Sequence, residues 1–271
     1  MVNLCEWLEV SKSGFYAWER RTVSLRYLED QQLLEAISKV FLDSEGRYGS
    51  PRVYEELKSQ GIKVGRKRVA RLMRQAGLRG RVVRVTHRNP GLKKFHAKGK
   101  NLLLDMEKPK SINQVWVADI TYLKVKGKWQ YLATVMDLYS RRIIGWSLST
   151  NRTTVVTRAA LTYALKKRDY PKDVVFHTDR GVEYRGAEFQ SMLGSHQFKH
   201  SMNRPGQCTD NAFMESFFHS LKAELIRGTS YNSPKELRRE LARYINKFYN
   251  TRRLHSGLEY VSPCKYEQQA V

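Results

Sequence analysis

Residues 115–122 read Val-Trp-Val-Ala-Asp-Ile-Thr-Tyr, an apolar run interrupted by one carboxylate, Asp119. The β-branched and aromatic residues of this run predict a buried strand. An unpaired charge inside such a strand is costly, because it loses its hydration. Asp119 therefore requires a compensating partner, and a divalent cation is one candidate.

The residues that follow continue the strand pattern. β-rich runs at residues 115–125, 129–138 and 141–148 are separated only by short turn segments, which predicts three adjacent antiparallel strands. A helix is expected at residues 153–167 and an apolar strand at 174–176. Strands and helices that alternate in this way indicate a mixed α/β fold.

Two further carboxylates are placed where they can join Asp119. Asp179 follows an apolar strand and precedes Arg180 and Gly181, so it lies at the carboxyl end of a strand, where open α/β sheets gather ligand sites. Glu215 belongs to a helix expected over residues 210–226, with Asp210 as its cap. The expected apolar stripe of that helix is Phe213, Phe217, Leu221 and Leu225, and the opposite face carries Glu215, His219 and Lys222.

A set of carboxylates suits a hard divalent cation. Asp119, Asp179 and Glu215 are separated by 59 and 35 residues. Their oxygen atoms suit Mg²⁺ or Mn²⁺, and two such ions about 4 Å apart can stabilise both the attacking and the leaving oxygen of a phosphodiester. The three residues are the predicted catalytic and metal-binding set.

The charge balance points to a polyanionic partner. The chain has 49 Lys and Arg against 26 Asp and Glu, which leaves a formal charge of +23. Residues 61–100 contain 14 Lys or Arg and no acidic residue. We expect nucleic acid to bind there, the alternative being a solvated basic face. No apolar stretch approaches the roughly 20 residues that span a bilayer, and three separated cysteines fit a reducing compartment, so we expect a soluble intracellular protein.

The first 80 residues read as short helices. They are expected at residues 30–41, 51–60 and 66–75, and residues 7–18 resemble half of a helix-turn-helix. In the helix at 66–75, Val69, Leu72 and Met73 can face a core. The candidate DNA-contacting residues of the same helix are Arg66, Lys67, Arg68, Arg71 and Arg74.

These patterns predict four parts of the chain. Residues 1–80 form a helical DNA-binding region and residues 81–110 a basic linker. Residues 111–230 form the catalytic core, and residues 231–271 a C-terminal helical extension opened by a Ser233 cap. We expect Asp137 and Asp210 to support the structure and not to bind metal.

Several motifs together resemble a known family. They are the segments at 116–122, 137–142, 177–181 and 210–218, with Arg47-Tyr48-Gly49 ahead of the basic helix and residues 249–255 near the end. The chain resembles the retroviral-integrase-like superfamily with an Asp-Asp-Glu (DDE) site, and specifically the OrfB transposases of bacterial insertion sequences. The resemblance covers nearly the whole chain.

The resemblance implies a fold and a reaction. The fold is an RNase H-like mixed sheet flanked by helices, preceded by an all-helical, helix-turn-helix-like region. The activity is cleavage of DNA at the ends of an insertion sequence and strand transfer during recombination and integration, with Mg²⁺ (or Mn²⁺), two ions per site, held by Asp119, Asp179 and Glu215. Lys222 matches a basic position that contacts the DNA end.

The same resemblance implies partners. These are double-stranded DNA, both terminal inverted repeats and target, a dimer or higher oligomer on DNA, and an upstream OrfA helix-turn-helix protein as fusion or complex. The expected place is the bacterial cytoplasm, at the nucleoid. The chain departs from the superfamily in lacking a His-His-Cys-Cys zinc module, and it has Glu183 where a Gln-like residue is usual.

Three other functions remain open from the sequence. Arg252, Arg253, His255 and Tyr260 superficially resemble the set of the tyrosine recombinases, but their tight clustering argues against that class. A metal-dependent nuclease of the same fold would use water and never join ends. A catalytically inactive DNA-binding regulator would keep the basic region without the chemistry.

Overall fold

The computed structural model describes residues 2–81 and 100–269 of the chain. It divides into two compact units, Met1–Arg81 and Val82–Val271, which we describe separately. Most of the expected basic linker, at residues 82–99, lies outside the described residues.

Unit 1 (Met1–Arg81) is entirely helical in its described part. Three of its helices pack around Ile37, Val53 and Val69, whose side chains are fully buried. Leu72 and Met73 are also buried, which confirms the predicted core face of the basic helix. The helices are α1 (Val2–Trp7), α2 (Lys12–Glu19), α3 (Leu25–Asp43), α4 (Ser50–Ser59) and α5 (Arg66–Gln75).

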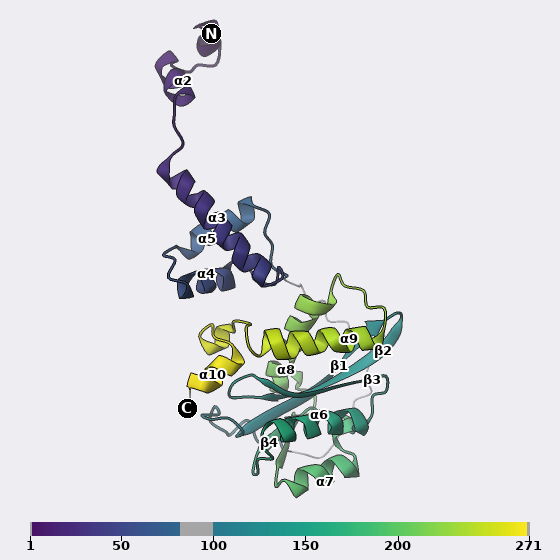
Figure 1. The fold of residues 1–271 in the computed structure, drawn as a ribbon. Coiled ribbons are helices and arrows are strands. Elements are labelled where there is room, and N and C mark those ends of the chain that lie inside the picture. Colours follow the sequence, from purple (N-terminus) through teal and green to yellow (C-terminus); the bar gives the residue numbers. More distant parts are fainter. Residues whose placement is uncertain (1, 82–99, 270–271) are drawn as a thin grey trace. The chain divides into compact units, whose positions relative to one another are not determined.

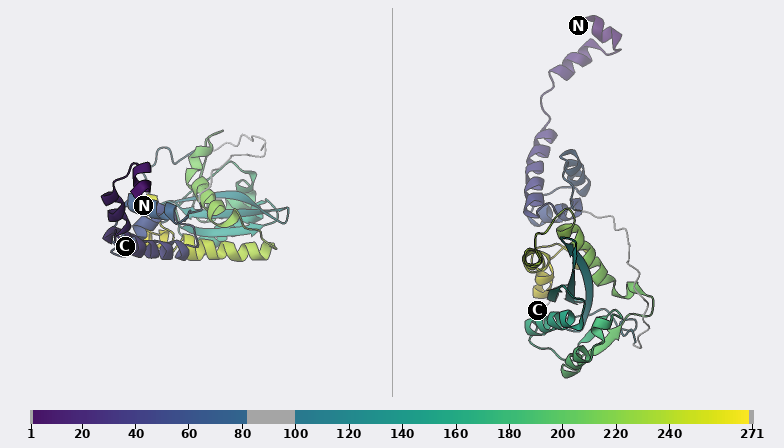
Figure 2. Two further views of the ribbon diagram at one scale, coloured as in Figure 1. Left: turned by 90° about the horizontal axis from the view of Figure 1, so that it is seen from above. Right: turned by 90° about the vertical axis from the view of Figure 1, so that its right-hand side faces the viewer.

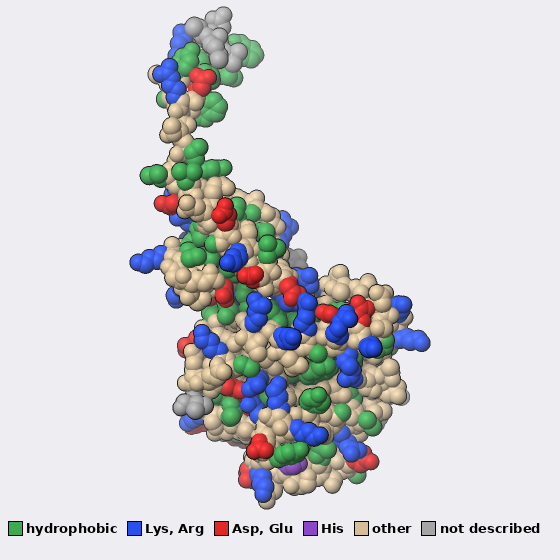
Figure 3. Space-filling model, in the orientation of Figure 1, with side chains coloured by type: hydrophobic (Ala, Val, Ile, Leu, Met, Phe, Trp, Pro, Cys, Tyr) green, Lys and Arg blue, Asp and Glu red, His purple; other side chains and the backbone are tan. Residues whose placement is uncertain are grey.

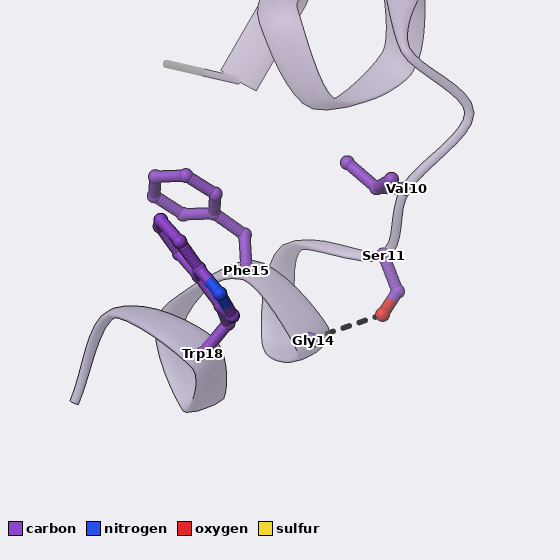
Figure 4. Close-up of a pocket in the computed structure, with 5 residues that line it drawn as sticks. All are labelled: Val10, Ser11, Gly14, Phe15 and Trp18. Carbon is purple, nitrogen blue, oxygen red and sulfur yellow. Dashed lines mark hydrogen bonds between the residues drawn. The ribbon is translucent and has the colours of Figure 1, made fainter. Parts of the chain in front are cut away.

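Helices α1 and α2 carry exposed aromatic side chains. Trp7 and Trp18 are 87% and 67% exposed. Ser11 caps α2 by accepting a hydrogen bond from the backbone N–H of Gly14 at 3.0 Å (Figure 4). Phe15 and Trp18 lie beside each other and line a small apolar pocket with Val10. Two short helices joined by a turn are present, but α1 ends at Trp7, so the first helix lies before the predicted segment at residues 7–18.

Unit 2 (Val82–Val271) is built on a five-stranded mixed sheet in the order β3-β2-β1-β4-β5 (Figure 1). The pairs β1–β2 and β2–β3 are antiparallel, as predicted, whereas β1–β4 and β4–β5 are parallel. Figure 2 shows the same sheet from two further directions. The strands are β1 (Val115–Val125), β2 (Lys128–Asp137), β3 (Ile143–Ser149), β4 (Val175–Thr178) and β5 (Lys199–Met202).

One face of the sheet is covered by α6 (Thr154–Lys167) and α7 (Ala187–Ser195). Trp116 and Ala118 of β1 share a core cluster with side chains of both helices. Gly145 of β3 lies so close to α6 that a Cβ atom would stand 2.2 Å from the carbonyl oxygen of Ala160. A glycine is needed at that position, because this face of the sheet and α6 are in backbone contact.

The other face of the sheet is covered from the C-terminal half of the chain. Neighbouring residues of a strand point to opposite faces, so Val117 and Asp119 point away from α6. Helix α8 contacts β1. The remaining elements are η1 (Val182–Tyr184), η2 (Cys208–Asn211), α8 (Ala212–Leu221), η3 (Lys222–Ile226), α9 (Pro234–Ala242), η4 (Arg243–Tyr249), η5 (Ser256–Leu258) and α10 (Pro263–Gln269).

The last helices differ from their predicted form in two ways. The continuous helices expected over residues 210–226 and 234–249 each end in a π-helical segment, η3 and η4. Ser233 caps α9 as predicted, by accepting from the backbone N–H of Glu236 at 3.1 Å. The predicted Asp210 cap is wrong, since Asn211 takes the cap position and Asp210 pairs instead with Arg204.

The predicted apolar stripe of α8 is wrong at Phe213. That ring is 39% exposed and lies beneath the guanidinium of Arg141, 5.2 Å from ring centroid to Cζ. Met214 is fully buried in its place. The buried set Met214, Phe217, Phe218 and Leu221 has the i, i+3, i+4, i+7 spacing of one helix face, and Phe217, Leu221 and Leu225 are buried as predicted.

The C-terminal segment, residues 250–269, is bonded to the sheet through side chains. The carboxamide of Asn250 accepts from the N–H of Ile143 and donates to the carbonyl of the same residue, both at 2.9 Å. Glu267 on α10 accepts from Ser140 and pairs with Arg142 and with Arg168. Over the described residues, no helix combines the length and apolar character needed to cross a membrane.

Candidate active site

Asp119 lies in the middle of β1, on the face of the sheet turned away from α6. It stands opposite Thr134 of β2 in the antiparallel register. Its carboxylate accepts from the neighbouring N–H of Ile120 at 2.7 Å. β1 lies between β2 and β4, and its backbone pairs with both strands. This pairing fixes the position of Asp119 in the middle of the sheet.

Asp179 lies near Asp119, just beyond the end of the neighbouring strand β4. β1 and β4 are parallel, with Val117 paired to His177, so the residue two positions further on each strand is an aspartate. Asp179 comes directly after the end of β4 and accepts from the N–H of Gly181 at 2.9 Å. The register therefore places side by side the two aspartates that the sequence had predicted to act together.

The surroundings of the two aspartates are short of positive charge. Burial raises the pKa of Asp119 well above its usual value, and the nearby charges of Asp179 and Glu215 raise it further. Burial also raises the pKa of Asp179, and Glu183 adds to the effect, while the Gly181 N–H and Arg152 oppose it. Several carboxylates thus lie close together around Asp119 and Asp179 and repel one another.

Glu215 is exposed, in the first turn of α8. The start of α8 is tied to β1 beside Asp119, because Asn211 donates from Nδ2 to the carbonyl of Ala118 at 3.1 Å. Glu215 acts on Asp119 electrostatically. Within residues 2–81 and 100–269, no three His, Cys, Asp or Glu side chains are gathered closely enough to hold a metal ion. The structure thus brings the two aspartates together and keeps Glu215 at their margin.

Lys222 follows the last residue of α8 and contacts β1. Its Nζ atom is 4.8 Å from the ring centroid of Tyr122, which is on β1. Burial lowers the pKa of Lys222, whereas the charge of Asp119 raises it. The half-buried lysine is therefore within the electrostatic range of the aspartates.

Two residues at this site could not be assigned from the sequence. Glu183 is only 4% exposed and its Oε1 lies 2.5 Å from Nε of Arg152. The side chain of Tyr184 is buried, and burial followed by the charges of Asp119 and Asp179 raises its pKa well above the usual value. The one available signal was the unusual acid at position 183, whereas nothing in the sequence around Arg152 pointed to this site.

The two supporting carboxylates have partners in their own chain. Asp137 is fully buried, accepts from the N–H groups of Asn113 and Tyr139, and lies 3.3 Å from Arg168. Asp210 pairs with Arg204, whose hydrogen bond holds the pKa of Asp210 below its usual range. Neither carboxylate is placed with Asp119.

The predicted DNA-contacting residues of α5 fall into two groups. Arg66, Lys67 and Arg74 are exposed. Arg68 and Arg71 instead pair with Asp30 of α3, each at 2.7 Å. The second group therefore holds α5 against α3.

The residues that suggested a tyrosine recombinase are not assembled for that reaction. Arg253 is 5% exposed and its guanidinium pairs with the buried carboxylate of Glu224 at 2.6 Å. The same guanidinium donates to Ser220 at 3.0 Å. A guanidinium enclosed in this way is not available to a DNA phosphate.

The parallel strands β4 and β5 are also joined by hydrogen bonds of two histidine side chains, His177 and His200. The buried ring of His177 bonds to Ser201 at 2.8 Å and to Asn203 at 2.7 Å. Nε2 of His200 lies 3.0 Å from the hydroxyl of Thr178, and its Nδ1 lies 3.0 Å from Gln190. Burial lowers the pKa of His200 to about 4, and His177 contributes in the same direction.

The depressed pKa of His200 predicts loss of stability in acid. Below pH 6.5 the unfolded chain protonates this histidine and the folded chain does not, so the free energy of unfolding falls between pH 6.5 and 4, by about 2–3 kcal/mol. Urea denaturation across this range checks it. In His200→Gln, the free energy of unfolding should fall less over this pH range, by about 2–3 kcal/mol, than it does in the wild type. An equal fall in the two proteins would contradict the assignment.

Comparisons with known proteins agree with these features. A family model described as an integrase core domain matches residues 109–208, and a second with the same description matches 196–263. A model described as an HTH-like domain matches residues 28–85, which carry α3–α5 and not α1–α2. The mixed sheet flanked by helices and the helical N-terminal region are therefore confirmed.

The chain also resembles whole proteins. It is 40% identical over 272 residues to transposase InsF for insertion sequence IS3A of Escherichia coli (strain K12), which covers 98% of this chain and 93% of the relative. It is 36% identical over 248 residues to the transposase for insertion sequence element IS904 of Lactococcus lactis subsp. lactis, with 92% and 98% covered. A chain of the simian T-cell lymphotropic virus intasome matches with 14% identity and a TM-score of 0.47, over 85% of this chain and 74% of that one.

Proposed function

Since this chain belongs to the family of insertion-sequence transposases that includes InsF of IS3, we propose that Asp119, Asp179 and Glu215 are its catalytic carboxylates. The observation that supports this most directly is the parallel register of β1 and β4, in which both aspartates come two residues after the paired Val117 and His177. Helix α8, tied by Asn211 to the carbonyl of Ala118, supplies the third carboxylate from the same face.

The donor set fits a hard divalent cation. The carboxylate groups supply only oxygen ligands, and the mutual repulsion that raises the pKa of Asp119 is relieved when a cation enters. We propose Mg²⁺, or Mn²⁺, with two ions per site held by Asp119, Asp179 and Glu215. When bound, the ions would stabilise negative charge on the attacking and leaving oxygens of the phosphodiester.

We propose two successive reactions at this site. Water first hydrolyses a phosphodiester at the end of the element, which leaves a 3′ hydroxyl. That hydroxyl then attacks a phosphodiester of the target and displaces the target's own 3′ oxygen, so one bond is broken for each bond formed. We further propose that Lys222 positions a DNA phosphate near Asp119, because its ammonium group contacts β1 at Tyr122 and interacts electrostatically with Asp119.

DNA recognition is proposed for unit 1 and for the basic surface. The HTH-like helices α3–α5 present Arg66, Lys67 and Arg74 to solvent, where they can neutralise phosphates. Arg68 and Arg71 hold the same helix, α5, against α3 through their ion pairs with Asp30. On the face of unit 2 seen in Figure 3, Lys and Arg side chains far outnumber acidic ones. The proposed ligands are the terminal inverted repeats and the target duplex.

The reaction sets the expected assembly. Joining two ends of one element requires two active sites together, so we propose a dimer or higher oligomer on DNA. We further propose that the chain works with an upstream OrfA helix-turn-helix protein, as fusion or complex, at the nucleoid in the bacterial cytoplasm. Both proposals follow from the family of the chain.

The test of the proposed function is a joining assay. The full chain is offered a labelled duplex from the end of its element, together with a plasmid and Mg²⁺, and random duplex and excess chelator serve as controls. Labelled plasmid that forms only with end DNA and free Mg²⁺ supports a transposase. Cleavage without joining would indicate a nuclease, and binding without cleavage a regulator.

A further inference from the structure

A fourth carboxylate stands next to the two aspartates. Glu183 is buried in η1, and a Cβ atom built on Gly181 would lie 2.6 Å from Oε2 of Glu183 and 2.9 Å from Oδ1 of Asp179. The two carboxylates therefore flank the same glycine Cα, and a larger side chain at position 181 would displace them. Glu183 raises the pKa of Asp179, as a like charge at close range does.

The guanidinium of Arg152 interacts with all three of these acids, Asp119, Asp179 and Glu183. Nε of Arg152 lies 2.5 Å from Oε1 of Glu183, and its Nη2 lies 3.4 Å from Oε2. The charge of Arg152 also lowers the pKa of Asp119 and of Asp179. Arg152 therefore forms an ion pair with Glu183, and its charge acts electrostatically, at longer range, on both aspartates.

The side chain of Tyr184 lies in the field of the same acids. Its hydroxyl is buried and, within the described part of the chain, has no hydrogen-bond partner. Burial raises its pKa, and Asp119, Asp179 and Glu183 all raise it further. The acids and Arg152 thus lie close together in a partly buried region, in which each charge affects the others.

We propose that Glu183 and Arg152 are a positioning pair that sets the affinity of Asp119 and Asp179 for a divalent cation. Glu183 holds the guanidinium of Arg152 away from the two aspartates and adds a negative charge beside Asp179. Arg152 limits the excess of negative charge when the cation is absent. This inference rests on the proposed function, because it takes Asp119 and Asp179 as cation ligands.

The structure dictates opposite effects for the two members of the pair. In Glu183→Gln, one negative charge is lost and Arg152 is released toward the aspartates, so cation binding weakens. In Arg152→Gln, the competing positive charge is lost, so binding strengthens. In the double variant the total charge is that of the wild type, so binding returns toward the wild-type value.

Calorimetric titration of the full chain with Mn²⁺, without DNA, tests the pair. We expect about tenfold weaker binding for Glu183→Gln, about tenfold tighter binding for Arg152→Gln, and less than about threefold change for the double variant. Glu183→Gln is nearly isosteric and serves as the primary variant. Melting temperatures measured without metal show that each variant is folded, and Arg152→Lys, which keeps the charge, should bind like the wild type.

Matched controls come from a second Arg–Glu pair. Arg158 and Glu188 pair on the exposed side of α6 and α7, so Arg158→Gln and Glu188→Gln make the same charge changes away from the site. These variants should leave Mn²⁺ binding unchanged. Shifts of equal sign in Glu183→Gln and Arg152→Gln, or no shift in either, would overturn the inference.

Asp119→Asn separates this inference from the proposed function. Loss of Mn²⁺ binding in Asp119→Asn, with no change in the Glu183 and Arg152 variants, removes only the positioning pair. Undiminished Mn²⁺ binding in Asp119→Asn removes the proposed catalytic site itself.

Discussion

Replacing Asp119 by Asn is expected to reduce both cleavage and joining of DNA by at least about 10³-fold, which corresponds to a barrier higher by about 4 kcal/mol. Asn keeps the shape of the side chain and removes the charge that a divalent cation would bind. Asp179→Asn and Glu215→Gln should have the same effect. The measurement is the joining assay, with DNA binding followed in parallel by a gel shift at fixed salt concentration.

The stability of these variants separates a catalytic role from a structural one. Because burial and like charges raise the pKa of Asp119, its ionised form is destabilised in the folded chain, and Asp119→Asn should melt no lower than the wild type. Asp137→Asn is the matched control on the next strand. Both oxygens of Asp137 accept backbone N–H groups, so an Asn side chain leaves one of these groups without its acceptor, and the variant should melt lower and yet remain active when folded. Normal joining by Asp119→Asn would reject the assigned site.

Replacing Arg253 by Ala is expected to lower the free energy of unfolding of unit 2 by about 3–5 kcal/mol. The substitution leaves the carboxylate of Glu224 buried without its counter-ion, 4% exposed. It also removes the guanidinium packed on the ring of Tyr249, 5.7 Å from centroid to Cζ. Urea denaturation of the full chain measures the change in the unit 2 transition.

Two comparisons isolate the buried pair from the loss of a basic side chain. Lys247→Ala removes an exposed basic side chain near it in the chain and should change stability by less than about 0.5 kcal/mol. The double variant Arg253→Met with Glu224→Leu removes both charges and should recover much of the loss. An Arg253→Ala protein as stable as the wild type would show that the pair does not hold the C-terminal segment.

The parts of the fold that the sequence predicted are those encoded by local patterns. β1 begins and ends at the predicted residues, Val115 and Val125, because a run rich in β-branched and aromatic residues between turn segments has few alternatives. Helix α5 also has its predicted bounds, Arg66–Gln75, since its apolar residues repeat with helical spacing. The parallel pairing of β1 with β4 could not be derived from either segment alone.

The features that sequence reasoning missed depend on residues far apart in the chain. Arg152 and Glu183 belong to different elements, and so do Arg168 and Glu267, and charged side chains carry no periodic signal that would link them. Phe213 was placed in the core by spacing alone, although a stripe that begins at Met214 and keeps Phe217 and Leu221 fits the same helix. The choice between the two stripes is made by packing against the sheet, which is not a local property.

The two hydrogen bonds between Asn250 and Ile143 bear on how the molecule avoids aggregation. β3 is an outer strand of the sheet, and the exposed N–H and C=O groups of an outer strand can recruit a strand from another molecule. The carboxamide of Asn250 occupies both groups of Ile143, as a neighbouring strand would do. The C-terminal segment thus blocks the start of β3 against intermolecular β-pairing, a protection that a chain shortened before residue 250 would lose.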